Sequence, residues 1–569
     1  MVFSPLANGC TTFAVGRKAT LDGSVMATHS NDGGGTTDPR FVRVPARDYP
    51  DGEPRPIYYS PENYPRFVGK DRNVPVYYPE NCQGGNSKCQ TFQPIGYIPQ
   101  VNHTFAYFEA TYGIMNEHQV GIAESTCSGV FAALAKDHGG KALLSIDQLS
   151  QIAMERATTS RDAVLLIGEL AERYGFYGES ASFEGGSESL IITDPTEAWV
   201  FHILADPKGT SAVWVAARVP DDSVAVVANM FSIREVDLSD TANFLGRKDM
   251  WELAIEYGLY KEDDPKDFTK TFSDGEYAHK YYSGRRMWGV FNLLSHSQKL
   301  PAEYNNLKDD APYPFAVSVD FLVTPKDIMT VMRYWYNGTA YSTSDGMASG
   351  PFNTPDRYTG GYDYVGAGSW ERTIAIYRSS DSYVIQSRPV PNSIGGVIWF
   401  GPGAAHSTNY VPILSSNALA PDCLQWGWQG VYNTSSSYWA HRNVLNLIQV
   451  KFNYMIQDVI LLQNELEQQS QDLIDSLTEN NVVPSQEEKD NLIEVNACKS
   501  VKYFSDLLNY LLYTYADGNY NYWKNDSFHA DSIGNFSVKS SSLPRFSQSL
   551  FLRRLSSLVV GTSWLCRWT

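Results

Sequence analysis

Cysteine is scarce in this chain of 569 residues, which has only seven. Seven is too few for a disulfide scaffold, and no two form the Cys-x-x-Cys pair typical of structural zinc sites. Cys82 and Cys89 bracket a polar loop and are the only pair close enough to suggest a local disulfide, with two free thiols as the alternative. Spacing suggests no partner for Cys423, Cys498 or Cys566. The odd total leaves at least one cysteine unpaired within the chain.

Long apolar runs, excess positive charge and several catalytic motifs are also missing. No stretch approaches the roughly 18 to 20 apolar residues that cross a bilayer, so we expect no transmembrane segment. The 45 basic and 63 acidic residues give a net charge of −18, which argues against nucleic acid as a partner because an acidic surface repels phosphates. The absence of His-Glu-x-x-His, Gly-x-Ser-x-Gly and phosphate-loop motifs argues against a metallopeptidase, an α/β-hydrolase and a P-loop enzyme. We expect no metal and no cofactor.

The composition is that of a globular protein with a large core. Hydrophobic residues make up 43% of the chain, charged residues 19% and aromatic residues 13%, so the chain is not disordered. The length would allow three or four domains, or one large enzyme domain.

Apolar alternation and turn residues predict strands in two blocks. A strand precedes a hairpin turn at Leu21-Asp-Gly-Ser24, and a second strand follows before the glycine-rich loop that begins at Asp32. Further strands are predicted at 107–115, 120–123, 190–192, 199–203, 212–217, 224–227, 371–388 and 394–400. Residues 46–100, rich in Pro, Tyr and Asn, predict a long irregular excursion.

Helical periodicity predicts helices between and after these strands. Ser145-x-x-Gln148 predicts a capping box that opens a helix through Met154, and Gly175 is expected to end the next helix. The predicted helices cover 145–154, 161–174, 251–257, 326–334, 444–466 and 486–512. Since βαβ units are not evident, we expect an α+β fold of antiparallel sheets covered by helices, rather than a TIM barrel or a Rossmann domain.

The segment Cys10-Thr-Thr-Phe-Ala-Val-Gly-Arg-Lys-Ala-Thr-Leu-Asp-Gly-Ser24, continuing to His29-Ser-Asn-Asp32, resembles the start of the C69 family of dipeptidases. These are N-terminal nucleophile hydrolases related to penicillin V acylase and the secernins. Further matches lie at Asn116-Glu-His118, Gly121 to Thr126, Glu188 to Leu190, Asp194 to Trp199, Arg218 to Asp221, Ala228-Asn229, Gly350-Pro-Phe352 with Pro355 and Arg357, Gln386 to Arg388 and Ile394 to Trp399.

The resemblance covers about residues 10–525 and implies a four-layer αββα fold with additional C-terminal helices. It implies a leader at 1–9, a catalytic domain at 10–525 and a tail at 526–569. The tail is Ser-rich, then basic and apolar, and we interpret it as an appendage, with a membrane-surface helix as the weaker alternative.

A cysteine at a mature N-terminus carries both a nucleophile and a base. Its thiol has a pKa of about 8.5 and its α-amine one of about 7.7 to 8.0, so the amine can accept the thiol proton and return it to the leaving amine. The scheme requires removal of Met1 to Gly9. Gly9, which lacks a Cβ, suits attack of the Cys10 thiol on its carbonyl, with release of the leader through a thioester. Trimming by a signal peptidase is the alternative.

Residues around Cys10 receive roles from the resemblance. Asp32 would orient the Cys10 amine, with an Asx turn as the structural alternative. His29 stands where many relatives have Arg, so a guanidinium role cannot be transferred, and we expect His29 to line the pocket and make activity pH-sensitive. Asn229 would donate to the oxyanion, with a turn cap at the end of the strand as the structural alternative. Thr193 also occupies a position where relatives have pocket residues.

A dipeptidase must also bind the two charged ends of its substrate. Arg234 or Arg357 would bind the carboxylate, and Glu124 or Asp194 would meet the ammonium; surface salt bridges explain these residues equally well.

Three functions remain open: a cysteine dipeptidase, an acylase acting on N-acyl amides, and a non-catalytic scaffold. The sequence leaves the oligomeric state open. We expect secretion or a lysosomal location if a signal peptide is missing from the given chain, and a cytoplasmic location otherwise.

Overall fold

The computed structural model describes residues 9–33, 38–60, 68–82, 91–179, 186–302, 313–357, 371–427, 429–479, 483–524 and 527–532. Within these ranges, no helix has both the length and the apolar character needed to cross a bilayer. Residues 1–8 of the predicted leader, Cys89 and residues 533–569 lie outside the described ranges, so the Cys82–Cys89 pair and the nature of the tail stay predictions.

Seven antiparallel strands form the first sheet, in the order β16-β14-β1-β2-β17-β18-β19. Their bounds are β1 Thr11–Val15, β2 Val25–Asn31, β14 Ser223–Val227, β16 Ala316–Ser318, β17 Asp381–Ser387, β18 Gly396–Pro402 and β19 Val411–Leu414. The predicted hairpin joins β1 to β2, and Gly23 supplies its positive φ of 75°. Since β1 has neighbours on both sides, the residue that precedes it lies in the interior.

Eight antiparallel strands form the second sheet, in the order β15-β13-β12-β11-β10-β9-β8-β3. Their bounds are β3 Val42–Val44, β8 Tyr107–Glu109, β9 Gly113–Asn116, β10 Gly121–Cys127, β11 Ser187–Thr193, β12 Ala198–Ala205, β13 Ala212–Arg218 and β15 Phe244–Gly246. The predicted strand at 107–115 is two strands, with an irregularity in the β8–β9 pairing beside Glu109.

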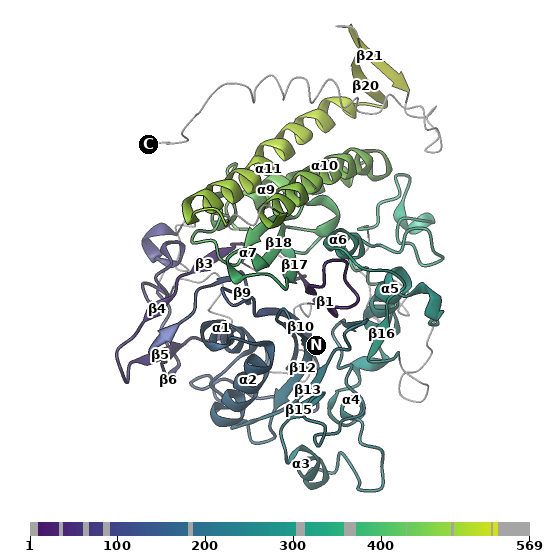
Figure 1. Ribbon diagram of the computed structural model, residues 1–569. Helices are drawn as coiled ribbons and strands as arrows, with labels where there is room; N and C mark the ends of the chain where they lie inside the picture. Colours follow the sequence, from purple (N-terminus) through teal and green to yellow (C-terminus); the bar gives the residue numbers. More distant parts are fainter. Residues whose placement is uncertain are drawn as a thin grey trace.

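The two sheets pack face to face. Small and branched side chains from both sheets, such as Ala27 and Ile385 with Ala123 and Ile191, share one buried core. Helices cover the outer faces, with α1 (Ile146–Arg156) and α2 (Ser160–Tyr174) on the second sheet and α5 (Arg285–Leu294) and α6 (Pro325–Met332) on the first (Figure 1). The predicted α+β class with antiparallel sheets is confirmed.

Three long helices follow the last strand of the first sheet (Figure 1). They are α9 Ser437–Ile448, α10 Phe452–Glu479 and α11 Gln486–Thr514. A disulfide between Cys423 in α8 (Asp422–Gln425) and Cys498 in α11 ties this layer together, with the Cα atoms 5.5 Å apart. Spacing did not suggest this bond, because its partners are 75 residues apart.

The remaining elements are short. They are α3 Met250–Glu256, α4 Phe268–Phe272, α7 Asn392–Gly395, β4 Arg47–Asp48 paired with β7 His103–Thr104, β5 Pro54–Ile57 paired with β6 Gly96–Pro99, and β20 Asn519–Lys524 paired with β21 Ser527–Ser532. The β20–β21 hairpin spans the predicted domain boundary at 525. Residues 46–100 are largely irregular where described, as expected.

Two local predictions were wrong. Ser145 precedes α1, but its hydroxyl donates to the Asp147 carboxylate instead of capping the helix. The strand predicted over 371–388 begins only at Asp381, because the polar groups of the preceding segment are used elsewhere, on Asp32. Gly175, with a φ of 78°, ends α2 as predicted.

Candidate active site

Strand register brings the key residues to Cys10. Cys10 precedes β1, which pairs with β2 on one side and β14 on the other. Asp32 follows the end of β2 and Asn229 lies two residues after β14, so both flank Cys10. All three are buried. The antiparallel pairing of strands distant in sequence therefore builds the site.

The Cys10 thiol lies in a dry and negatively charged environment. Its residue is 1% exposed. Burial raises the pKa of the thiol well above its usual range, and the charges of Glu124 and Asp32 raise it further, while a hydrogen bond with the Asp32 backbone lowers it. The thiol is therefore protonated at neutral pH in this form of the chain.

Two arginines donate hydrogen bonds to the backbone carbonyls of Gly9 and Cys10. Arg372 Nη2 donates to the Gly9 carbonyl oxygen at 2.8 Å. Arg286 Nη1 donates to the Cys10 carbonyl oxygen at 2.7 Å, and Ser125 Oγ donates to the same oxygen at 3.3 Å. Positive charge thus meets both carbonyls that flank the thiol.

Asp32 is the counter-ion of Arg372. Neither side chain has any exposed surface. The Asp32 carboxylate also accepts hydrogen bonds from the hydroxyls of Ser379 and Ser30, and its backbone carbonyl accepts one from Arg378 Nε at 3.0 Å. These bonds compensate for burying the charge, which would otherwise be costly.

Arg286 also orients the Asn229 side chain. Its Nη2 donates to Asn229 Oδ1 at 2.6 Å, while Asn229 Nδ2 donates to the Thr126 carbonyl oxygen at 2.6 Å. Since an arginine only donates and a carbonyl only accepts, the amide orientation is unambiguous. Burial, followed by the like charge of Arg372, lowers the pKa of Arg286 to about 10.

Space around Gly9 is too small for a side chain. A Cβ there would lie 2.0 Å from the Tyr282 hydroxyl oxygen and 3.3 Å from Asn229 Oδ1. Tyr282 belongs to a π-helical turn, Lys280–Gly284, that leads into α5. Such turns are rare and frequently occur at functional sites.

His29 and Glu124 form the wall beside the thiol. His29 Nδ1 lies 2.8 Å from the Glu124 backbone oxygen and must donate to it. The His29 Nε2 and Glu124 Oε2 atoms are buried, and neither has a hydrogen-bond partner among the described residues. The Cys10 sulfur, a His29 ring nitrogen and a Glu124 carboxylate oxygen all lie within 4.8 Å of one another, so these side chains are also the ones that could hold a metal ion.

Burial lowers the pKa of His29. The imidazole is therefore neutral at and above neutral pH, and the pH sensitivity expected of it moves towards acid. That sensitivity itself stays a prediction.

A second buried carboxyl group lies next to Glu124. Glu188, on β11, pairs with Thr126 of β10, and Thr126 Oγ1 donates to Glu124 at 2.9 Å. Burial and then the charge of Glu124 raise the pKa of Glu188 well above its usual range. Burial and this neighbouring carboxyl group therefore favour the neutral form of Glu188.

Thr193 and Asp194 lie further along β11. Thr193 pairs with Gly121, three residues from the Leu190–Glu124 pair, which is roughly 10 Å along a strand. Asp194 accepts hydrogen bonds from the backbone N–H groups of Ser160 and Thr196. These contacts hold a turn and the start of α2, and their geometry does not involve Cys10.

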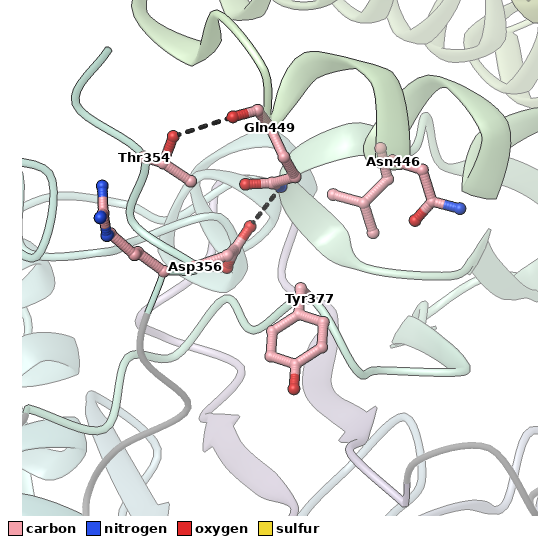
Figure 2. A pocket seen from close by; sticks show the side chains of 7 residues that line it. Thr354, Asp356, Tyr377, Asn446 and Gln449 are labelled. Carbon is pink, nitrogen blue, oxygen red and sulfur yellow. Dashed lines mark hydrogen bonds between the residues drawn. The ribbon is translucent and has the colours of Figure 1, made fainter. Parts of the chain in front are cut away.

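The two candidate arginines for a substrate carboxylate differ. Arg234 forms an ion pair with Asp267 at 2.6 Å. Arg357 is exposed and lines a pocket of about 290 Å³ together with Thr354, Asp356, Tyr377, Leu445, Asn446 and Gln449. Figure 2 shows Gln449 hydrogen-bonded to both Thr354 and Asp356, with Tyr377 on the other side of the pocket.

One short segment, residues 377–379, connects this pocket to the residues around Cys10. Tyr377 lines the pocket, and Ser379, two residues later, donates to Asp32. Arg442 from α9 donates to the backbone carbonyls of both residues of this segment. The segment that positions Asp32 is thus fixed from the pocket side.

Sequence reasoning did not find several residues of the site. Arg286 lies in a helix that was not predicted, and Arg372 fell inside a predicted strand. The position of Arg372 beside the apolar run Ile374-Ala-Ile376 did indicate a special role, because a charged side chain in a buried segment needs a partner. Nothing in the sequence indicated that the partner would be Asp32.

Known proteins resemble this chain over most of its length. The family model described as "Peptidase family C69" matches residues 9–465. A "Probable dipeptidase" of Latilactobacillus sakei is 24% identical over 452 residues, which cover 78% of this chain and 81% of that protein. "Dipeptidase A" of Lactobacillus helveticus is 24% identical over 439 residues, covering 76% and 80% respectively.

A match that begins at Gly9 includes Cys10 and all the site residues described above. This chain belongs to peptidase family C69 and is a peptidase.

Proposed function

We propose that this peptidase is a cysteine dipeptidase whose nucleophile is the Cys10 thiol, exposed by removal of residues 1–9. The two packed sheets with helices outside support the expected four-layer αββα arrangement of N-terminal nucleophile hydrolases. The observation that carries the proposal is that Arg372 donates to the carbonyl of the buried Gly9–Cys10 peptide bond, while Arg286 donates to the carbonyl of Cys10 itself. A cysteine with a purely structural role at the start of a strand does not need charged donors on both neighbouring carbonyls.

Catalysis in the mature chain uses the two functional groups of Cys10. The α-amine, freed when the leader leaves, accepts the thiol proton as the sulfur attacks the peptide carbonyl, and then returns it to the leaving amine. Asp32, whose backbone contacts the thiol, orients that amine. Water then hydrolyses the thioester.

Asn229 is the amide donor to the tetrahedral oxygen in this scheme. Its side chain lies close to Gly9, and Arg286 and Thr126 fix the orientation of its amide group. Nδ2 retains a second hydrogen that its bond to Thr126 does not use. Preorganised donors of this kind make a large contribution to acyl transfer.

The buried carboxyl pair Glu124–Glu188 favours a substrate with a free ammonium group. The Glu124 oxygen that has no partner among the described residues lies beside the thiol, where it could accept a hydrogen bond from the ammonium group of a dipeptide. An N-acyl amide has no such charge and would leave the carboxylate unpaired, which is costly in a buried site. The names of the two relatives reported above, "Probable dipeptidase" and "Dipeptidase A", support the same substrate class.

Hydrolysis of dipeptides and of their N-acetyl derivatives, measured side by side, tests the proposal. We expect turnover of the free dipeptides, loss of it in Cys10→Ala, and retention in Cys127→Ser, which removes the other free buried thiol. Glu124→Gln should raise KM for dipeptides roughly ten- to hundredfold, since a bond to a charged group contributes about 1.5 to 3 kcal/mol. Glu80→Gln, at an exposed position, is the control.

Preferential cleavage of the N-acetyl compounds would favour the acylase alternative. An unreactive Cys10 thiol, together with no hydrolysis of either substrate, would favour the non-catalytic scaffold.

A further inference from the structure

We infer that Arg372 is a catalytic residue that stabilises the oxyanion twice, first when the chain removes its own leader and then during peptide hydrolysis. The inference rests on the proposed function of Cys10. It assigns the electrophilic role to a residue about 360 positions away in sequence.

The guanidinium of Arg372 is placed for this role. Its Nη2 bridges the Gly9 carbonyl oxygen, at 2.8 Å, and the Asp32 carboxylate. Gly9 contributes the carbonyl that the Cys10 thiol must attack if the leader is to leave. A charged donor already on that oxygen gains strength as the oxygen becomes an anion.

The surroundings prevent Arg372 from moving away. Its Nη1 donates to the Thr373 backbone oxygen, and Asp32 is itself held by Ser379 and Ser30. Burial lowers the pKa of Arg372, but the charge of Asp32 and the other groups around the guanidinium together more than offset this effect, so the pKa is raised above its usual value. The group is therefore a fixed cation and needs no reorganisation during the reaction.

Leader release proceeds through a thioester between Gly9 and the Cys10 sulfur. The Cys10 sulfur forms a bond to the Gly9 carbonyl carbon, and the carbonyl oxygen becomes an oxyanion against Arg372. The Gly9–Cys10 C–N bond breaks, and the nitrogen takes the thiol proton to become the free α-amine. Water hydrolyses the resulting thioester, which gives a leader that ends in a Gly9 carboxylate and restores the thiol.

The same donor serves the second reaction because the geometry is shared. Once the leader has left, the acyl carbonyl of a peptide attacked by Cys10 must occupy the position that the Gly9 carbonyl held. Arg372 Nη2 faces that position. Asn229 faces Gly9 with its amide oxygen, 3.3 Å from a Cβ built there, and an oxygen cannot donate, so Arg372 is the donor on this carbonyl while the leader is attached.

Two rates measured on Arg372 variants test the inference. The first is leader release from the full chain, followed by intact mass over time after synthesis. The second is dipeptide hydrolysis by a chain produced to begin at Cys10, which needs no self-cleavage. Arg372→Lys keeps a cation for Asp32 but loses the planar fork that bridges two oxygens. Arg372→Gln removes the charge, and a thermal unfolding scan shows whether each variant is folded.

Arg55→Lys is the matched control. Arg55 is also a buried arginine paired with a carboxylate, Glu155 at 2.7 Å, and it is not part of the site.

We expect Arg372→Gln to slow leader release and to lower kcat by roughly 10²- to 10³-fold each, as for loss of one oxyanion donor. Arg372→Lys should slow both by at least about tenfold, and Arg55→Lys should stay within a few-fold of wild type. The inference is overturned if either rate remains within a few-fold of wild type in a folded Arg372→Lys chain. If the wild-type chain beginning at Cys10 hydrolyses no dipeptide, the proposed function fails, while leader release still judges the role of Arg372 in self-cleavage.

Discussion

Arg372 and Asp32 form an ion pair in which neither side chain exposes any surface. Buried pairs are poor sources of stability, because the cost of removing two charges from water offsets their attraction. Breaking one is nevertheless destabilising. Here the pair lies on the carbonyl of Gly9 and beside the thiol of Cys10, which points to a role in chemistry rather than in holding the fold.

Asp32→Asn should therefore lower the free energy of unfolding by about 3 to 5 kcal/mol, because it leaves Arg372 buried without a counter-ion. Urea denaturation measures the change. Arg247→Gln, which breaks a pair with the largely exposed Asp249, should cost no more than about 1 kcal/mol. Equal effects of the two substitutions would contradict this account of the buried pair.

Gly9→Ala should block or strongly slow release of the leader. The new Cβ would meet the Tyr282 hydroxyl oxygen at 2.0 Å, so the peptide bond must shift away from Arg372. Tyr282→Phe removes that oxygen and should partly restore cleavage in the double variant. Intact mass gives the readout. Gly518→Ala, where a Cβ meets nothing within 4 Å, should behave as wild type; cleavage at the normal rate in Gly9→Ala would show that the clash is irrelevant.

Asn229→Ala should lower kcat by roughly 10² to 10³, the usual effect of removing one oxyanion donor. KM should change less, because the lost bond forms in the transition state. Steady-state kinetics on one dipeptide decide the point. Asn243→Ala, on an exposed turn, is the control. A rate within a few-fold of wild type in Asn229→Ala would remove this residue from the mechanism.

Loss of the Cys423–Cys498 disulfide should destabilise the chain by about 4 kcal/mol, the loop-closure estimate for a bond that spans 75 residues. The double substitution to alanine tests it in denaturant titrations. Addition of a reductant should destabilise wild type by at least as much, because it can reduce this bond and any other disulfide of the chain. A double variant as stable as wild type would argue that the bond is not formed in solution.

His202 and His441 should each lower the free energy of unfolding as the pH drops below 6.5, whereas Asp381 and Asp458, whose pKa burial raises to about 7, act in the opposite direction. Burial lowers the pKa of His202 to about 3 and that of His441 to about 4. The unfolded chain, with ordinary histidines, takes up protons that the folded chain cannot, so each residue costs about 2 kcal/mol at pH 5 relative to neutral pH. Unfolding at pH 7 and pH 5 measures this. Compared with wild type, His202→Gln should remove the contribution of His202 to the change in the free energy of unfolding between pH 7 and pH 5. His103→Gln, at an exposed position, should leave that change as it is in wild type.

The sequence was sufficient to predict the parts of the fold that depend on local pattern. The β1–β2 hairpin follows from Asp22-Gly23, and α2 ends at Gly175 as its glycine indicates. Sheet order was beyond reach, because pairings such as β2 with β17 join segments about 350 residues apart. The failed capping box at Ser145 shows that a matching spacing does not ensure that the hydroxyl bonds to the backbone.

The candidate site divides in the same way. Cys10, Asp32 and Asn229 were found through a motif, and the strand register brings them together. Arg286 and Arg372 lie in no matched segment, and Glu188 lies in one but received no role, because the relation of all three to Cys10 exists only in three dimensions. A charged residue within an apolar stretch of sequence is the one feature that could have drawn attention to these residues.

Intact mass and thiol labelling of the purified full chain test the central claim most directly. The account predicts a mass that lacks Met1 to Gly9, a new N-terminus at Cys10, and loss of activity when one thiol per chain is alkylated at Cys10. Cys10→Ala should retain residues 1–9. A fully active enzyme that still carries Met1 to Gly9 would contradict the account.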